Sequence, residues 1–254
     1  MAVVLEGGCR VSTMYEGAPR VFGSLRVWNQ IGRASGAEAI SLRILEFGPG
    51  ISQGLLNREC DEVFYVLEGE CTLFIDGRPY AVGPETGIYL QPGKTLSVKS
   101  AGPDVVRFVS SQCPEETFEI VTAALTSSGD SQQPLPIVKL SDRRALPTAD
   151  RWYRVLVDDE VGSEQVTQFV GSIPPGRAPD HFHEYEEVLF ILRGEGRMWA
   201  GETNTPIGPG SCIYLPKRQV HCVENTGDGE LRLLGVFYPA GSPAVRYEAA
   251  DERK

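Results

Sequence analysis

The chain has 254 residues, of which 41% are hydrophobic and 23% charged, a composition typical of a folded globular protein. Its formal net charge of −10 repels nucleic-acid backbones, and no basic stripe interleaved with aromatic residues is present, which argues against a nucleic-acid partner. No apolar run approaches the roughly eighteen residues that cross a bilayer, and the start MAVVLEGGCR lacks the features of a signal peptide. We therefore expect a cytoplasmic protein without a membrane partner.

Short runs of β-branched and aromatic residues, separated by Gly, Pro, Asp and Asn, recur along the chain. In order they are ISLRILEFGPG (40–50), EVFYVLEGE (62–70), CTLFIDGRP (71–79), EVLFILRGEG (187–196) and LRLLGVFYP (231–239). No long segment has strong helical periodicity, so these runs predict an all-β fold. The six cysteines form no C-x-x-C pair, so we expect reduced thiols and assign none of them as a metal ligand.

The sequence repeats itself with a constant offset. EVFYVLEGE at 62–70 matches EVLFILRGE at 187–195, and GPETGIYL at 83–90 matches GPGSCIYL at 208–215, each 125 residues apart. A gap-free offset over about sixty residues indicates two copies of one structural unit. The polar stretch TSSGDSQQPLP at 126–136 is typical of a linker, so we place the halves at 1–125 and 137–254. Halves of this size predict two tandem jelly-roll barrels.

All three histidines fall in one pattern in the second half. His181, His183 and Glu187 share the parity that places side chains on one face of an extended segment, and His221 follows on a later strand. Isolated histidines in β proteins are more often hydrogen-bonded core or surface residues. Three imidazoles and a carboxylate nevertheless suit one divalent transition metal, namely Mn, Fe, Co, Ni, Cu or Zn, rather than Ca or Mg. Such a set leaves coordination positions open for water, substrate or dioxygen.

Two spaced motifs in this half resemble those of the cupin superfamily. They read Gly176-x4-His181-x-His183-x3-Glu187-x6-Gly194 and Gly208-x7-Pro216-x4-His221-x3-Asn225. The first motif has four residues rather than the usual five before its first histidine, and the second lacks the usual glycine before its last histidine. With the repeat, the chain resembles a two-domain bicupin. The resemblance implies a metal held inside the barrel by His181, His183, Glu187 and His221.

The first half lacks this ligand set. Subtracting 125 from the ligand positions gives Leu56, Arg58, Glu62 and Leu96, of which only the carboxylate can bind a metal. We therefore expect a metal-free N-terminal barrel with a structural role. We also expect Arg58 to form an ion pair with Glu62 where the metal would lie, because an uncompensated buried carboxylate is costly.

The motif alone leaves the reaction open, because one fold supports many functions. Our first expectation is a dioxygenase-like oxidoreductase that acts on a small organic molecule. The alternatives are a Lewis-acid isomerase, decarboxylase or C–N hydrolase similar to the ureidoglycine aminohydrolases, and a non-catalytic small-molecule-binding cupin. The expected assembly is a monomer or a homodimer.

Several further residues are candidates for the site. Glu187 and Tyr185, which shares the parity of the ligands, are the predicted catalytic residues. Arg177 and Arg193 are predicted to contact a carboxylate-bearing substrate, with Arg197 close by in sequence, although solvated positions at the rim are the more common outcome for arginines. Gln168 is a further candidate substrate contact from the preceding strand.

Overall fold

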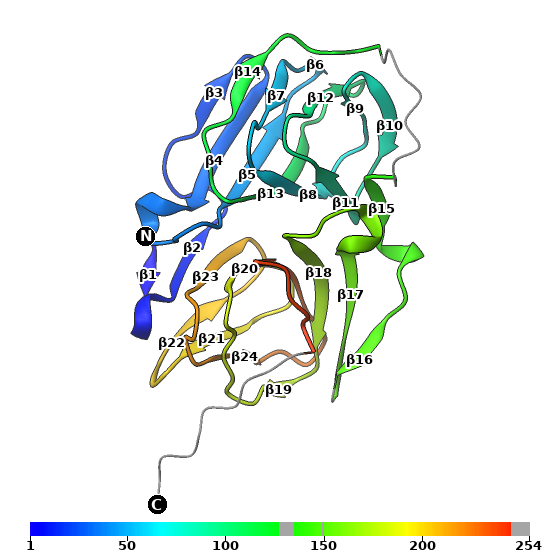
Figure 1. The fold of residues 1–254 in the computed structure, drawn as a ribbon. Coiled ribbons are helices and arrows are strands. Elements are labelled where there is room, and N and C mark those ends of the chain that lie inside the picture. Colours follow the sequence, from blue (N-terminus) through cyan, green and yellow to red (C-terminus); the bar gives the residue numbers. More distant parts are fainter. Residues whose placement is uncertain (127–134, 149, 245–254) are drawn as a thin grey trace, which may run out of the picture.

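The computed structural model describes residues 1–126, 135–148 and 150–244, and nearly all of its regular structure is β-strand (Figure 1). The strands form four sheets, two in each half of the molecule, which confirms the predicted all-β fold with two tandem jelly-roll domains. Most of the predicted linker, residues 127–134, lies outside the described residues. Within the described part, no helix is long and apolar enough to cross a membrane.

In the N-terminal half, a seven-stranded sheet packs against a smaller sheet. The order of the larger sheet is β15-β11-β8-β13-β5-β4-β3, and that of the smaller is β10-β9-β12-β7-β14, with β6 also paired to β12. The strands are β3 (Arg20–Phe22), β4 (Leu25–Ile31), β5 (Leu42–Phe47), β6 (Gly50–Ile51), β7 (Gly54–Leu56), β8 (Asp61–Glu68), β9 (Cys71–Ile75), β10 (Arg78–Val82), β11 (Thr86–Leu90), β12 (Thr95–Ser100), β13 (Val106–Cys113), β14 (Glu119–Val121) and β15 (Ile137–Lys139). Alternating apolar residues of the two sheets, among them Phe64, Phe108 and Leu73, form the core between them.

The C-terminal half repeats this arrangement. Its sheets have the orders β1-β2-β23-β20-β25-β18-β17-β16 and β19-β24-β21-β22. The strands are β1 (Val3–Val4), β2 (Arg10–Thr13), β16 (Leu146–Thr148), β17 (Arg151–Val157), β18 (Thr167–Ile173), β19 (Gly176–Arg177), β20 (Glu186–Arg193), β21 (Gly196–Ala200), β22 (Thr203–Ile207), β23 (Ser211–Leu215), β24 (His221–Asn225) and β25 (Leu231–Tyr238). Four single-turn 3₁₀ helices complete the described structure: η1 (Glu6–Gly8), η2 (Arg33–Ser35), η3 (Leu140–Asp142) and η4 (Asp159–Val161).

The strand boundaries reproduce the offset found in the sequence. Strand β8 begins at Asp61 and β20 at Glu186, and β11 begins at Thr86 and β23 at Ser211, so each pair differs by 125. The repeat therefore extends from residue identity to the starts of these strands.

The two halves exchange strands. β2, near the start of the chain, pairs with β23 of the C-terminal half, with Val11 opposite Ile213. Reciprocally, β15, which follows the predicted linker, pairs with β11 of the N-terminal half, with Ile137 opposite Ile88. In Figure 1 the dark blue strands β1 and β2 lie beside the orange β23 of the C-terminal half. Each half therefore contains a strand from the other half of the sequence.

A shared apolar core joins the halves between their two larger sheets, including Trp28, Val63, Val188 and Leu234. Buried polar contacts border this core. The Glu186 carboxylate accepts hydrogen bonds from the Tyr214 hydroxyl and from the backbone N–H groups of residues 38–40 in the N-terminal half. This contact fixes the start of β20, next to the predicted metal ligand Glu187.

Candidate metal centre

The three histidines converge from two segments that pair side by side. His181 and His221 form an isolated antiparallel bridge, with N···O distances of 3.1 Å and 2.8 Å. His183 follows on the same segment, and its backbone carbonyl accepts a hydrogen bond of 2.7 Å from the Arg218 N–H. One ring nitrogen from each histidine lies within 4.8 Å of the others. The motif spacing thus brings the three imidazoles together.

Backbone carbonyls fix the tautomers of two of these histidines. The Nδ1 atom of His181 lies 3.0 Å from the Pro179 carbonyl oxygen, and that of His221 lies 2.7 Å from the Gln219 carbonyl oxygen. A carbonyl oxygen only accepts, so each Nδ1 atom must carry the proton. Each Nε2 atom then has its lone pair available for a metal, and the second hydrogen bond sets the ring orientation.

Glu187 completes the set from β20. Its Oε2 atom lies 3.7 Å from Nε2 of His183 and 3.6 Å from Nε2 of His221. All three side chains are almost fully buried. Burial raises the pKa of the Glu187 carboxyl to about 8 and, together with the neighbouring His181, lowers the pKa of His221 well below its usual range. The metal-free site therefore holds a carboxylic acid and a neutral imidazole at pH 7.

The donor set fits one divalent transition metal. Ligand atoms bound at about 2.1 Å to a tetrahedral or octahedral ion lie about 3.0 to 3.4 Å apart, only slightly closer than the separations between Glu187 and the two imidazoles. Imidazole nitrogens with one buried carboxylate oxygen suit the borderline divalent metals. Metal binding requires Glu187 to lose its proton and provides the positive charge that its buried carboxylate lacks.

A small cavity of about 90 Å³ adjoins the four side chains. The described residues of its wall are mainly apolar and aromatic. They are Thr148, Arg151, Trp152, Tyr153, Phe169, Gly171, Ser172, Ile173, Ala178, Leu189, Val223, Leu233, Phe237 and Pro243. The wall thus resembles a preformed site for a small ligand, with few polar groups to orient it.

Arg151 is the one cationic side chain among these described wall residues. Its side chain is 12% exposed, and its Nε atom donates a 2.9 Å hydrogen bond to Asp150. The sequence interpretation missed this residue. Its signal was the alternation in RWYRVLV at 151–157, which places Arg151 on the same face as the wall residue Tyr153.

The structure places Tyr185 behind His183 and not on the wall of the cavity. Its ring stacks on the imidazole with a centroid separation of 4.9 Å and an interplanar angle of 10°. Its hydroxyl donates a 3.2 Å hydrogen bond to the Ser242 carbonyl. Tyr185 therefore supports a ligand, and the structure gives no contact with the cavity for the catalytic role predicted from its parity.

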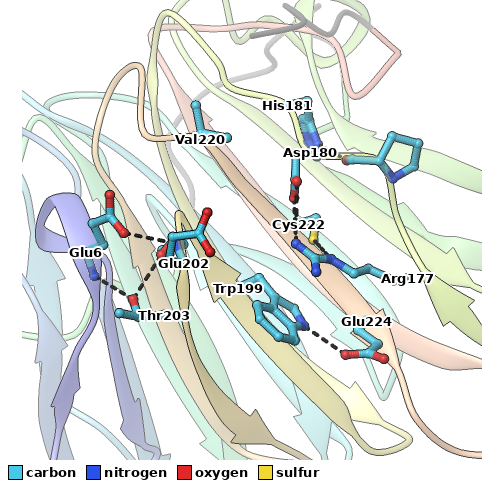
Figure 2. A network of polar contacts seen from close by, with 12 residues as sticks. Glu6, Arg177, Asp180, His181, Trp199, Glu202, Thr203, Val220, Cys222 and Glu224 are labelled. Atoms are coloured by element: carbon cyan, nitrogen blue, oxygen red, sulfur yellow. Dashed lines mark hydrogen bonds and ion pairs between the residues drawn. The ribbon is translucent and has the colours of Figure 1, made fainter. Parts of the chain in front are cut away.

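Arg177 and Arg193, which were predicted to contact a substrate, both lie outside the cavity. Figure 2 shows Arg177 over the Trp199 ring, with its guanidinium beside Asp180 and Cys222. Arg193 pairs with Glu230 on the exposed side of β20. Arg197 likewise bonds to Asn204 on the outside of β21. Arg193 shares the parity of Glu187, but a register shift in β20 between Ile191 and Arg193 breaks the alternation before it.

Gln168 also faces away from the site. Its neighbours Phe169, Gly171 and Ile173 line the cavity, whereas the Gln168 amide oxygen lies against Gly87 in the shared core between the halves. Gln168, which was predicted to contact a substrate, therefore does not line this cavity. The parity of β18 could not be fixed from the sequence across Pro174-Pro175. In the structure Phe169, Gly171, Ser172 and Ile173 of this strand line the cavity, and Gln168 does not.

In the N-terminal half, the prediction that Arg58 pairs with Glu62 is also wrong. Arg58 is exposed and binds Glu119 through two hydrogen bonds of 2.6 Å and 2.8 Å. The buried Glu62 carboxylate instead pairs with Arg43 of β5. The expected cation is present, but it comes from a different strand.

The Arg43–Glu62 pair belongs to a buried polar cluster. Ser110 and Asn57 also donate hydrogen bonds to Glu62, and Gln112 donates to Asn57 at 2.7 Å. Because Glu62 matches Glu187 at the repeat offset of 125, this cluster corresponds to the candidate metal centre of the other half. It satisfies the carboxylate with side-chain donors and a guanidinium in place of an ion.

The comparisons with known proteins agree with the fold. A family model described as a cupin domain matches residues 169–237, and one described as an AraC-like ligand binding domain matches residues 62–170. Auxin-binding protein 1 of Arabidopsis thaliana is 32% identical over 86 residues, which are 30% of this chain and 43% of that protein. An oxalate-binding protein of Thermotoga maritima is 36% identical over 67 residues, which are 26% and 55% of the two chains. The chain therefore spans about half the length of these curated relatives.

Solved structures extend the likeness over nearly the whole chain. A mutant oxalate decarboxylase of Bacillus subtilis superposes with a TM-score of 0.72 at 15% identity, covering 90% of this chain and 76% of the other. The protein Ylba of E. coli superposes with a TM-score of 0.74 at 14% identity, covering 93% of both chains. Identities this low show the fold alone, and none of the relatives named here is described as a dioxygenase. Together with the repeated strand order and the two family models, these likenesses show that the chain belongs to the cupin superfamily and contains two tandem cupin domains.

Proposed function

We propose that the C-terminal cupin domain is a mononuclear metal centre that binds a small carboxylate, with oxalate as the representative ligand. The observation that carries the proposal is the placement of three imidazoles, Glu187 and Arg151 around one cavity of about 90 Å³. Two of the proteins named above have oxalate in their names, which supports a small carboxylate as the ligand.

The cavity suits a short organic acid in size and charge. A bound divalent metal would supply Lewis-acid charge that attracts a chelating carboxylate. Arg151 lines the same cavity, and although its Nε atom is bonded to Asp150, its two terminal nitrogens carry N–H donors that match the two oxygens of a second carboxylate group. The apolar wall, including Phe169 and Phe237, limits the water that competes for these contacts. Chelation at the metal with pairing at Arg151 would hold both ends of a two-carbon diacid.

The proposed chemistry is ligand binding or a Lewis-acid reaction such as decarboxylation. Glu187 is the only carboxyl group among the described wall residues, and as a metal ligand it is committed to the ion. No other acidic side chain of the described wall can move a proton, so the arrangement favours binding over a reaction that needs a dedicated base.

The test is a titration of the metal-loaded protein with oxalate, followed by calorimetry, with assays for carbon dioxide and formate under nitrogen and in air. The proposal predicts binding that requires the metal and is lost in His221→Ala. A measured lack of oxalate binding by the metal-loaded protein would contradict it. Dioxygen consumption with an organic substrate that does not compete with oxalate would instead favour the dioxygenase expected from the sequence.

A further inference from the structure

The first residues of the chain form an arm that reaches the metal-bearing domain. The arm, residues 3–13, comprises β1, η1 and β2, and its side chains Leu5, Cys9 and Val11 are buried in the C-terminal core. Strand β2 pairs with β23. The arm is thus a packed part of the second domain, although it lies more than 160 residues before the metal ligands in sequence.

The middle of the arm contacts the turn that precedes His221. Gly7 has a φ of +66°, and a Cβ atom built there would lie 1.4 Å from the amide oxygen of Gln219. The missing side chain therefore leaves the space that the Gln219 amide fills. That amide donates a 2.8 Å hydrogen bond to the Val220 carbonyl, and the Gln219 carbonyl orients His221.

Glu6 holds the neighbouring hairpin from the same side. Its carboxylate accepts a 2.9 Å hydrogen bond from the Glu202 N–H, and its own N–H donates one of 2.9 Å to the Thr203 hydroxyl (Figure 2). The adjacent Gly201 N–H donates a 3.1 Å hydrogen bond to the Val220 carbonyl. Two short routes, through Gly7 and through Glu6, therefore connect the arm to the residues immediately before the metal ligand.

We propose that the N-terminal arm positions His221 for metal binding, with Gly7 and Glu6 as positioning residues. The His221 imidazole can ligate only if the turn that supplies its Nδ1 acceptor stays in place. The arm holds that turn through the Gln219 amide and the Val220 carbonyl. A partner that orients a metal-binding histidine is typically worth about 10- to 100-fold in metal affinity. This inference rests on the metal site proposed above and not on the ligand proposed for it.

The test measures Co²⁺ binding by the full-length metal-free protein, with a chelator competing for the ion and the d–d absorption reporting the coordination geometry. Gly7→Ala and Glu6→Ala should each weaken Co²⁺ binding by about 10- to 100-fold and alter the spectrum. Val4→Ala, at an exposed position of the same arm, is the matched control and should bind as the wild type does. In a Gln219→Ala background, which removes the amide that Gly7 accommodates, Gly7→Ala should add no further loss.

The outcomes separate this inference from the proposed site. Wild-type affinity and spectrum in both arm variants would overturn the inference even if their melting temperatures fell, because an arm that only stabilises the fold does not change ligation. A full additional loss from Gly7→Ala in the Gln219→Ala background would overturn the route through Gln219. Failure of the wild type and Val4→Ala to bind Co²⁺ would overturn the metal site and the inference together.

Discussion

Replacing Arg43 by Met tests whether an ion pair takes the place of the metal in the N-terminal domain. Arg43 and Glu62 are 4% and 0% exposed, so the substitution leaves a buried carboxylate with hydrogen bonds but no counter-charge. Breaking a buried pair by removing one partner costs about 3–5 kcal/mol of unfolding free energy. For a chain of this size the apparent Tm should fall by roughly 10 °C.

The assay is chemical and thermal denaturation of the wild type, Arg43→Met, Glu62→Leu and the double variant. If the two side chains act as a pair, the double variant should lose much less stability than the two single losses combined, with a coupling of about 2 kcal/mol or more. Arg58→Ala removes an exposed arginine of the same domain and is the matched control, which should leave the midpoint unchanged. A loss below about 1 kcal/mol for Arg43→Met, or additive losses in the double variant, would refute the reasoning.

Three further predictions concern the C-terminal domain. Because burial raises the Glu187 pKa from 4.5 to about 8, the metal-free protein should lose stability as pH rises from about 4.5 to 8, by up to about 5 kcal/mol, whereas Glu187→Gln should not. The lowered pKa of His221 destabilises both the wild type and Glu187→Gln as pH falls below about 6.5, so it does not affect the difference between their Tm values. A Tm difference between the two proteins that stays constant from about pH 5 to 8 would contradict this prediction. Arg151→Gln should weaken oxalate binding about tenfold or more and leave the metal content unchanged, and equal oxalate affinity in calorimetry would rule out the role of Arg151. Tyr185→Phe keeps the ring that stacks on His183 and should retain metal, whereas Tyr185→Ala should weaken Co²⁺ binding, as measured by chelator competition; equal affinities would show that the stack is dispensable.

The fold and the convergence of the four predicted ligands follow from local features of the sequence. Parity along 181–187 and the repeat offset place side chains through backbone geometry alone, and that geometry varies little within a strand. The offset of 125 residues is kept in strand starts such as Asp61 and Glu186, because the two copies pack the same pattern of buried strands.

The contacts that the sequence interpretation missed depend on which strands become neighbours. Arg43 lies nineteen residues before Glu62, and no local pattern marked it as the partner, whereas Arg58 was nearer in sequence but emerges at the exposed edge of β7 and β14. The exchange of β2 into the second domain brings Gly7 to Gln219 across more than 200 residues. Long-range pairing of this kind is a property of the assembled sheets and not of any short segment.

The arginines illustrate a second limit on predicting the site from the sequence. Arg177 and Arg193 lie closer in sequence to the ligand motif than Arg151 does, yet Arg177 packs on Trp199 and Arg193 pairs with Glu230, both outside the cavity. Arg151 lies thirty residues before His181 and reaches the cavity because β17 pairs with β18 in the same sheet. Nearness in sequence was therefore a poor guide to nearness in the site.

The most direct test of the account is the metal content of protein purified without added metal and then loaded with one divalent ion under chelator-controlled conditions. The account predicts one ion per chain, loss of that ion in His183→Ala and His221→Ala, and full retention in Arg43→Met and Arg58→Ala. Two ions per chain, or an ion retained after His221 is removed, would contradict a single metal centre in the C-terminal cupin domain.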